Sequence, residues 1–333
     1  MDFLEGLCSE VERFLGVSRF FEILFQGNYH ELLTYQGITA LIAPIIPLLV
    51  VLELTLGRIY KKPQSKVYKI TFLIYIANRI IGRFIAIGMV ALCIGFFSKY
   101  APWNIPNTWY GFLIAYIIWE FAHYIYHFLG HKVRLFWCFH ATHHTPEDMN
   151  LSVTYAHFFL EAPYADTIRT TICILLGVDP VTLFVIMFVD GTYGAFIHVG
   201  ENLIRDARFG FLNKIILTPS HHRVHHARNP LYIDTNYCNL LNIWDRVFGT
   251  YQEEQTKIKP EYGITRPYNS GNFWDIYFGE IVTLAKDVFD APGLYNKLKY
   301  VVMPPGWSHL GDHKTATVIK KQITQNNYTK AID

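Results

Sequence analysis

Long apolar stretches are the feature that most narrows what this 333-residue chain can fold into. The first runs from Gly37 to Leu56 and carries no charge apart from Glu53. A helix needs about 20 apolar residues to cross the hydrocarbon core of a bilayer, so this stretch is long enough. Of all residues, 51% are hydrophobic and 17% are charged, whereas soluble domains average about 25% charged residues. We therefore expect a multi-pass integral-membrane protein.

Three further apolar segments follow. One covers Ile70 to Phe97, and the next covers Trp109 to Phe128 and begins with two aromatic residues suited to the membrane interface. The last is a pair, Ile168–Leu176 and Val181–Phe196, split by Gly177–Pro180. Neither half of the pair crosses a bilayer comfortably. The pair predicts either a helical hairpin that enters and returns, or one kinked span followed by a shorter one.

Basic residues between these stretches predict the orientation, because cytoplasmic loops carry an excess of Lys and Arg. The connection between the second and third stretches carries one basic residue, Lys99. The connection after the first stretch is much richer and carries Arg58, Lys61, Lys62, Lys66 and Lys69. We expect this richer connection, and the C-terminal end of the third helix, to face the cytoplasm from a bacterial inner membrane or the endoplasmic reticulum.

Histidines are concentrated in the middle of the chain, where twelve of the fifteen lie between His123 and His226. Residues three and four apart share a face of a helix, so each cluster can present several imidazoles to one point. The clusters are His123, His127 and His131; His140, His143 and His144; and His221, His222, His225 and His226. A lone histidine, such as His157 or His198, is more often a core side chain. Clustered imidazoles each need partners for two ring nitrogens, which indicates a metal site.

The number of imidazoles favours two metal ions over one. Imidazole suits zinc, copper, iron or nickel, and a single zinc ion takes about four ligands. The metalloprotease motif H-E-x-x-H is absent. Two irons beneath a bilayer suit the activation of dioxygen against an unactivated C–H bond. A histidine-rich membrane metal transporter is the alternative from another class, but it predicts ligands along the spans rather than at their ends.

The predicted fold class is all-α: an integral-membrane helical bundle with a cytoplasmic helical cap carrying a histidine-rich di-metal site. Residues 1–108 form an N-terminal membrane region with two transmembrane helices, residues 109–255 the histidine-rich domain, and residues 256–333 the cytoplasmic cap and tail. Within the cap, residues 273–289 place apolar side chains on one helical face. That face suits either packing on the membrane surface or the core of the cap.

The spacing of the clusters resembles the three histidine boxes of the fatty acid hydroxylase / sterol desaturase superfamily. In that pattern an acidic residue precedes H-x3-H by seven positions, H-x2-H-H follows nine residues later, and another H-x2-H-H comes late in the chain. His131 and His140 are nine residues apart, which selects His127 and His131 as the first box and Glu120 as the acidic residue. The resemblance implies the ligands His127, His131, His140, His143, His144, His198, His221, His222, His225 and His226, and leaves His123 and His157 open.

Longer stretches are similar to the ether-lipid-cleaving monooxygenases of this superfamily, among them HATHHTPEDMNLS, LTPSHHRVHHARNPLYIDTNY and NIWDRVFGTYQEE. The likeness runs from about Trp103 to Trp307. It implies a di-iron monooxygenase that uses O2 to hydroxylate a membrane lipid, at the carbon next to an ether oxygen. Because no flavin or nucleotide motif is visible, electrons must come from a partner or a diffusible reductant such as tetrahydropterin. A sterol or fatty-acyl hydroxylase or desaturase is the alternative.

Several neighbours are expected to support the ligands. Glu120, Asp148, Glu161 and Asp234 are candidates to accept an imidazole N–H and fix the ring, and Asn236 and Asn229 are further candidates. The chain departs from those monooxygenases where Phe128 and Lys132 follow the two histidines of the first box, in place of arginine and glutamate. The net charge of +2 comes with no basic nucleic-acid-binding face, so no nucleic-acid partner is expected.

Overall fold

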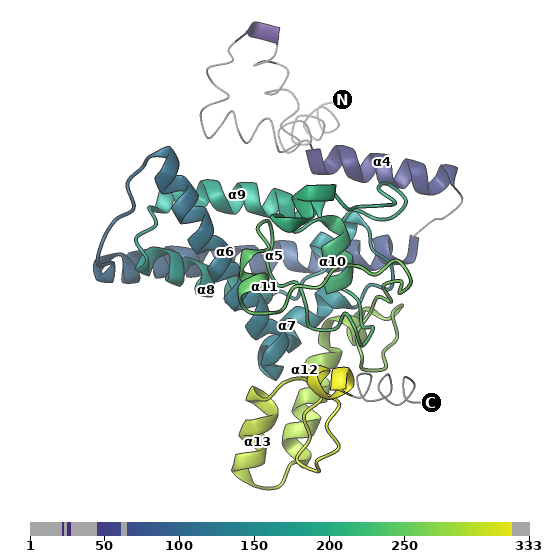
Figure 1. Ribbon diagram of the computed structural model, residues 1–333. Helices are drawn as coiled ribbons and strands as arrows, with labels where there is room; N and C mark the ends of the chain where they lie inside the picture. The colour runs from purple at the N-terminus through teal and green to yellow at the C-terminus, as the bar shows by residue number, and fades with distance from the viewer. Residues whose placement is uncertain (1–21, 23–24, 28–44, 61–64, 322–333) are drawn as a thin grey trace, which may run out of the picture.

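Helices make up nearly all the regular structure of the residues described by the computed structural model, which are 22, 25–27, 45–60 and 65–321 (Figure 1). Two isolated β-bridges, Ile216–Leu241 and Ala227–Tyr262, are the extended pairings found there. The predicted all-α class is therefore confirmed for this part of the chain. The helices are α4 (Ile45–Ile59), α5 (Ser65–Phe97), α6 (Trp109–Lys132), α7 (Arg134–His144), α8 (Glu161–Leu175), α9 (Pro180–Phe196), α10 (Pro219–His225), α11 (Ile243–Val247), α12 (Phe273–Asp290) and α13 (Gly293–Val302).

Helices α5, α6, α8 and α9 form an apolar bundle in which α8 packs against both α5 and α6. Its core contains fully buried side chains such as Trp119, Leu183 and Ile186. The outer face of α5 is also apolar, and Phe84 and Leu92 are exposed on it. Soluble proteins rarely expose a continuous apolar surface, so this face suits contact with lipid.

The membrane spans are only partly matched by the helices. Among the described helices, α6 alone is long and apolar enough to cross a membrane by length and composition. The apolar segments Phe84–Tyr100 and Pro180–Phe196 are shorter. Of the first apolar stretch, residues 45–56 lie in the 15-residue helix α4, while residues 37–44 lie outside the described residues. The loop lysines Lys61 and Lys62 lie outside them too.

The apolar pair after residue 168 forms a helical hairpin, which is one of the two predicted arrangements. α8 ends before Gly177, whose φ of +83° makes the turn, and Asp179 caps α9 by accepting from the N–H groups of Val181 and Thr182. The turn adjoins the α5–α6 connection, since Ile105 N–H donates to the Gly177 carbonyl at 2.8 Å. Both connections therefore lie at one end of the bundle.

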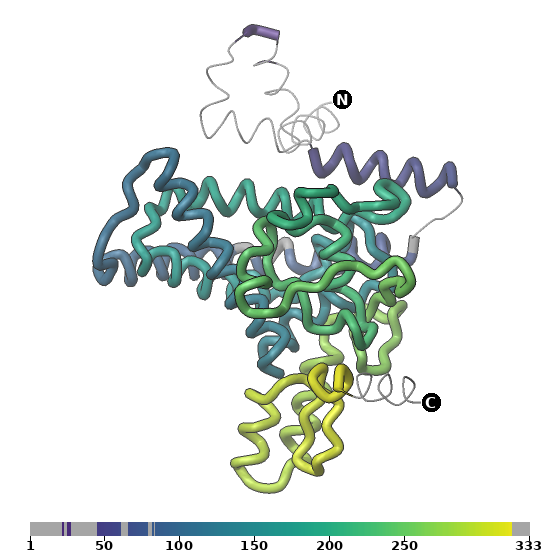
Figure 2. Tube along the Cα trace, viewed as in Figure 1, coloured from purple at the N-terminus to yellow at the C-terminus, as the bar shows by residue number. Residues whose placement is uncertain are grey.

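The C-terminal helices α12 and α13 project from the body beneath α7 (Figures 1 and 2). Arg134 of α7 pairs with Glu280 of α12 at 2.9 Å, and Ile276 and Leu284 are buried. Trp274 and Phe289 are exposed. The amphipathic helix predicted over residues 273–289 is thus present, with one face packed on the protein and apolar side chains on the other.

Candidate metal centre

Nine buried histidines lie in two groups where helices of the bundle meet α7 and α10. Each histidine offers one ring nitrogen, and within a group these nitrogens all lie within 4.8 Å of one another. The five-histidine group is His127, His131, His140, His144 and His225, and the four-histidine group is His143, His198, His222 and His226. The groups adjoin, because the rings of His144 and His226 stack with centroids 4.5 Å apart.

Helix geometry decides how the clusters divide between the groups. On α7, His140 and His144 belong to the five-histidine group and His143 to the other. The segment His222–His226 around the end of α10 divides in the opposite proportion. Its two end histidines belong to the four-histidine group, and His225 belongs to the five-histidine group. Residues four apart share a helical face, whereas adjacent residues are turned by about 100°. These two clusters therefore each supply both groups, whereas the first cluster supplies the five-histidine group alone, through His127 and His131.

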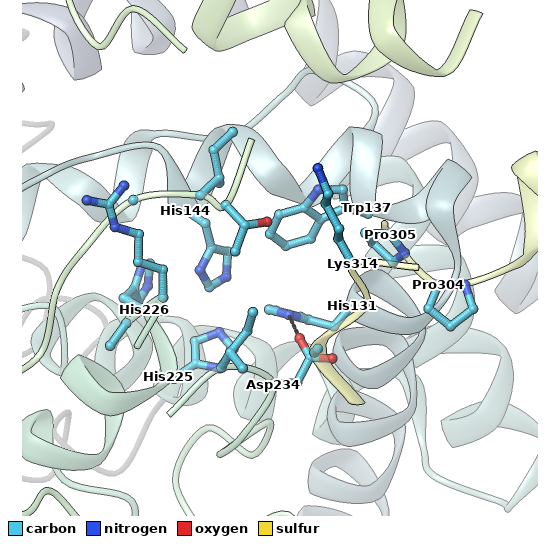
Figure 3. A pocket seen from close by; sticks show the side chains of 16 residues that line it. His131, Trp137, His144, His225, His226, Asp234, Pro304, Pro305 and Lys314 are labelled. Carbon is cyan, nitrogen blue, oxygen red and sulfur yellow. Dashed lines mark hydrogen bonds and ion pairs between the residues drawn. The ribbon is translucent and has the colours of Figure 1, made fainter. Parts of the chain in front are cut away.

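The five-histidine group converges on one point. His140 Nε2 lies 3.0 Å from His127 Nε2 and 3.0 Å from His144 Nε2. The Nε2 atoms of His131 and His225 are buried and have no hydrogen-bond partner among the described residues. Figure 3 shows His131, His144 and His225 turned toward one another, with Trp137 beside them.

In the four-histidine group, too, the ring nitrogens face one another at short distances. His198 Nε2 lies 3.1 Å from His143 Nε2 and 2.9 Å from His222 Nε2, and His222 Nε2 lies 3.0 Å from His226 Nε2. Metal–imidazole bonds of about 2.0–2.1 Å hold neighbouring ligand nitrogens about 3 Å apart. Two facing nitrogen lone pairs repel each other unless something lies between them. Both groups therefore fit a metal ion shared by their imidazoles.

The outward-facing nitrogens of five rings bond to protein acceptors, which assigns the N–H to Nδ1 and leaves the Nε2 lone pair for a metal. The distances from Nδ1 are 2.9 Å for His127 to the Tyr237 carbonyl, 3.3 Å for His131 to Asp234, 2.5 Å for His140 to Glu161, 2.6 Å for His198 to the Gly194 carbonyl and 2.8 Å for His225 to the Thr235 carbonyl. These acceptors fix ring orientation before any metal binds.

Three of those acceptors come from one loop, residues 234–237. Asp234 and Asn236 have φ of +58° and +57°, a left-handed conformation that Asp and Asn tolerate better than most residues. The two left-handed residues turn the chain so that the Asp234 carboxylate and the carbonyls of Thr235 and Tyr237 all face the five-histidine group. The Asn236 side chain holds the loop in place by donating hydrogen bonds to the carbonyls of His221 and Gln252.

Burial keeps these rings neutral, which is the form that binds metal. It holds the pKa of His143, His144 and His222 well below its usual value, and neighbouring imidazoles lower it further. It lowers the pKa of His198 to about 3. These four imidazoles are therefore neutral at neutral pH.

Lys132, the residue that replaces an expected carboxylate, binds Asp234. Its ammonium donates to Asp234 Oδ2 while His131 occupies Oδ1. Burial acts to raise the pKa of Asp234, but the bonds to His131 and Lys132 outweigh it and hold that pKa below its usual value. Asp234 thus accepts an imidazole N–H, as expected, and shares its charge with a lysine.

Four of the expected supporting side chains make no hydrogen bond to an imidazole within the described residues. Glu120 is fully buried and accepts from the backbone N–H groups of residues 239–241. Asn236 bonds to backbone, and Asn229 likewise bonds to the backbone of residues 259 and 261. Asp148 is exposed and makes no hydrogen bond to an imidazole within the described residues. The structure therefore places Glu120, Asn236 and Asn229 against loop backbone and Asp148 at the surface.

His221 also differs from the prediction, since the structure places it in neither group. Its Nδ1 faces the Thr218 N–H and hydroxyl in a capping box at the start of α10, and its Nε2 faces the Tyr251 hydroxyl at 2.8 Å. His123 and His157, which the resemblance left open as ligands, lie beside the two groups. His123 is 3.7 Å from Asp190, and His157 stacks on His143 with centroids 4.4 Å apart.

Two buried carboxylates were missed by the sequence reasoning. Glu53 accepts from the N–H groups of Leu151 and Gly200, and so ties α4 to the loops around the site. It was the one charge in the first apolar stretch, which was a usable signal. Asp190 of α9 accepts from the Tyr116 hydroxyl at 3.1 Å and lies beside His123. No local pattern distinguished Asp190.

Two adjoining sets of buried, neutral imidazoles at the ends of apolar helices define a histidine-rich candidate metal centre. Residues 112–250, which contain it, match the fatty acid hydroxylase family model. This segment is therefore similar to the fatty acid hydroxylase family, and the resemblance predicted from the histidine spacing is confirmed.

Relatives among curated proteins act on lipids according to their names. Alkylglycerol monooxygenase of Homo sapiens is 36% identical over 208 residues, covering 62% of this chain and 44% of the relative. The Xenopus tropicalis enzyme of the same name is 34% identical over 67% of this chain and 47% of its own. Ornithine lipid hydroxylase OlsE of Rhizobium tropici is 30% identical over 164 residues, 48% of each chain. The chain spans about half the length of the curated relatives it matches. No solved structure matches it.

Proposed function

We propose that this chain is a membrane-bound di-iron monooxygenase that hydroxylates a lipid at the carbon next to an ether oxygen. The observation that carries the proposal is the pair of converging imidazole groups in a domain similar to alkylglycerol monooxygenases. The five-histidine and four-histidine groups would hold one iron each, and the irons would supply dioxygen activation.

The reaction consumes one lipid C–H bond, O2, two electrons and two protons, and gives an alcohol and water. At a carbon next to an ether oxygen the alcohol is a hemiacetal, which collapses to an aldehyde and a free glycerol hydroxyl. The electrons come from outside the chain, from a tetrahydropterin or a partner protein. The protein's own part is to hold nine rings in place through acceptors such as Asp234 and Glu161, and to exclude water by burial.

The proposed topology is multi-pass, with residues 1–108 as the N-terminal membrane region, residues 109–255 as the catalytic domain and residues 256–333 as the cytoplasmic cap and tail. The histidines would face the cytoplasm. Support comes from the apolar α6, which ends in His131 and Lys132, and from the basic residues Arg58, Lys66 and Lys69 near the start of α5. The connections around Trp103 and Gly177 would then lie on the opposite side.

A metal analysis tests the proposal. Purified protein should contain about two irons per chain, since each group offers four or five imidazoles. The His143→Ala/His144→Ala double variant, which removes one ligand from each group, should lose most of this iron. His309→Ala is the matched control, because His309 lies in neither group and bonds to Tyr300. Well-folded wild type that contains no metal would overturn the proposal.

Plain hydroxylation without cleavage is the second candidate, favoured by the similarity to ornithine lipid hydroxylase. Incubating membranes with 1-O-alkylglycerol, O2 and a reduced pterin separates the two. Release of a fatty aldehyde supports ether cleavage. A stable hydroxylated lipid, from that substrate or from ornithine lipid, supports the second candidate.

A further inference from the structure

A large apolar groove runs along the helical bundle, with a volume of about 810 Å³. It lies between α5, α8 and α9, and its walls include Gly82, Ala86 and Val90 of α5 and Phe184 and Met187 of α9. The one carboxylate among its lining residues, Asp166, is paired with Arg169 at 2.5 Å. The lining residues that the structure describes therefore offer a nearly uncharged surface to an occupant.

One end of the groove reaches the metal centre. His157 lines the groove and stacks on His143, a member of the four-histidine group, with centroids 4.4 Å apart and planes 11° apart. His157 also bonds to Glu161 at 2.7 Å, and the same carboxylate holds His140. Asn78 lines this end too and donates to the His157 carbonyl. Two polar side chains of the groove, His157 and Asn78, thus lie where it meets the imidazoles.

The other end lies far along α5. From Asn78, at the polar end of the groove, to Gly95, the last lining residue of α5, the distance is about 25 Å of helix at about 1.5 Å per residue. One leaflet of a bilayer is about half of a 30 Å hydrocarbon core, so only a long and extended alkyl chain reaches the far end of the groove. A single extended alkyl chain fits the length, the apolar walls and the polar inner end together.

We propose that this groove binds the alkyl chain of a membrane ether lipid and presents its ether-bearing end to the four-histidine group beside His157. The proposal rests on the proposed function and adds to it the path of the substrate. It assigns the four-histidine group as the one that faces substrate. It also assigns the selection of chain length to the far end of the groove, around Gly95.

Two glycines of α5 give a matched pair of test sites. A Cβ built at Gly95 or at Gly88 meets no atom within 4 Å, so both positions accept a larger side chain without displacing the helix. Gly95 lines the groove and Gly88 does not. Gly82 is unsuitable, because its Cβ would lie 3.1 Å from the Phe159 carbonyl oxygen.

The experiment compares wild type with Gly95→Phe and Gly88→Phe on a series of 1-O-alkylglycerols that differ only in chain length. Gly95→Phe should lower kcat/KM for the long-chain substrates by about tenfold or more and leave the short-chain ones unchanged, because the lost space is at the far end. Gly88→Phe should keep the wild-type profile. Equal chain-length profiles for all three proteins would overturn the proposal.

A second readout does not depend on turnover. A 1-O-alkylglycerol with a photoreactive diazirine at the chain end should crosslink purified wild type near Ile94 and Phe184, and Gly95→Phe should suppress this crosslink. Labelling elsewhere, or labelling unaffected by Gly95→Phe, overturns the groove assignment. If crosslinking behaves as expected but wild type turns over no ether lipid, the groove stands and the proposed function fails.

Discussion

At the scale of single residues, the candidate metal centre depends on where each imidazole places its proton. Acceptors on the outside of five rings hold the N–H at Nδ1, and burial keeps the rings neutral. Among these acceptors, Asp234 should be the most sensitive to substitution, because one of its oxygens binds His131 and the other binds Lys132. Neighbours of this kind tune metal affinity without touching the metal.

Replacing Asp234 with asparagine should weaken metal binding about 10–100-fold, the usual effect of losing a carboxylate behind a ligand histidine. His131 would keep a neutral acceptor but lose the charge that orients it. The measurement is retention of iron against a chelator of known affinity. Asp206→Asn serves as control, since Asp206 is exposed and pairs with Arg208. Equal retention by both variants would contradict the role of Asp234.

The metal-free protein should lose stability as the pH falls below about 6.5, the ordinary histidine value. The pKa of the buried imidazoles is lower in the folded chain than in the unfolded chain, so the unfolded chain binds more protons in this range. The loss of stability begins near pH 6.5 and continues as the pH falls toward the pKa values of the folded chain. For His198 that pKa is about 3. Denaturant unfolding of chelator-treated protein at about pH 7.5 and about pH 5.5 measures it. Equal free energies of unfolding at the two pH values would be the contrary result.

At the scale of elements, helices supply the histidines and buried carboxylates hold the loops that orient them. Glu120 on α6 accepts three backbone N–H groups from residues 239–241, just after the loop of residues 234–237. Glu53 on α4 holds Leu151 and Gly200 in a similar way. The helices could not position the metal centre without these anchors, because the acceptors for His127, His131 and His225 come from the loop.

Glu120→Ala should lower the free energy of unfolding by about 3 kcal/mol, because it leaves three buried N–H groups without an acceptor. The folded fraction should keep its iron, since Glu120 contacts no imidazole. Glu120→Gln should be much milder, because an amide oxygen still accepts. Unfolding curves in detergent and iron content per folded chain test both points. Loss of iron from a chain of unchanged stability would instead indicate a ligand role.

The sequence allowed prediction of features that depend on residues close together in the chain. The helices and the facing of residues four apart follow from spacing, so nine of the ten implied ligand histidines come together. His221 was misplaced because a capping histidine and a ligand histidine look alike in sequence. The division into five and four, and the contact of Asp234 with His131, depend on how α6, α7 and a loop about a hundred residues later meet in space. No spacing within one helix contains that information.

At the scale of the whole molecule, the metal centre can be approached from two directions. The apolar groove reaches the four-histidine group past His157. A smaller, more polar pocket opens on the five-histidine group and is lined by Asp234, Arg228 and Lys314, as Figure 3 shows in part. An apolar substrate and water-soluble reactants therefore have separate faces available.

Cysteine labelling in intact cells should reveal the orientation of the chain. Lys99→Cys, in the connection after α5, should react with a membrane-impermeant maleimide from outside. Lys257→Cys, in the cap, should react only after the cells are permeabilised. The background is low among the described residues because Cys93, Cys138, Cys173 and Cys238 are buried. Labelling of Lys257→Cys in intact cells would reverse the proposed orientation.

Because two segments each contribute histidines to both groups, metal bound at one group would affect metal binding at the other. α7 gives two rings to the five-histidine group and one to the four-histidine group, and the segment His222–His226 does the opposite. An ion that draws one group together thereby sets the positions of α7 and α10 for the second, which is positive coupling between binding events. Chains supplied with too little iron should accordingly sort into empty and fully loaded molecules, with few that hold a single ion.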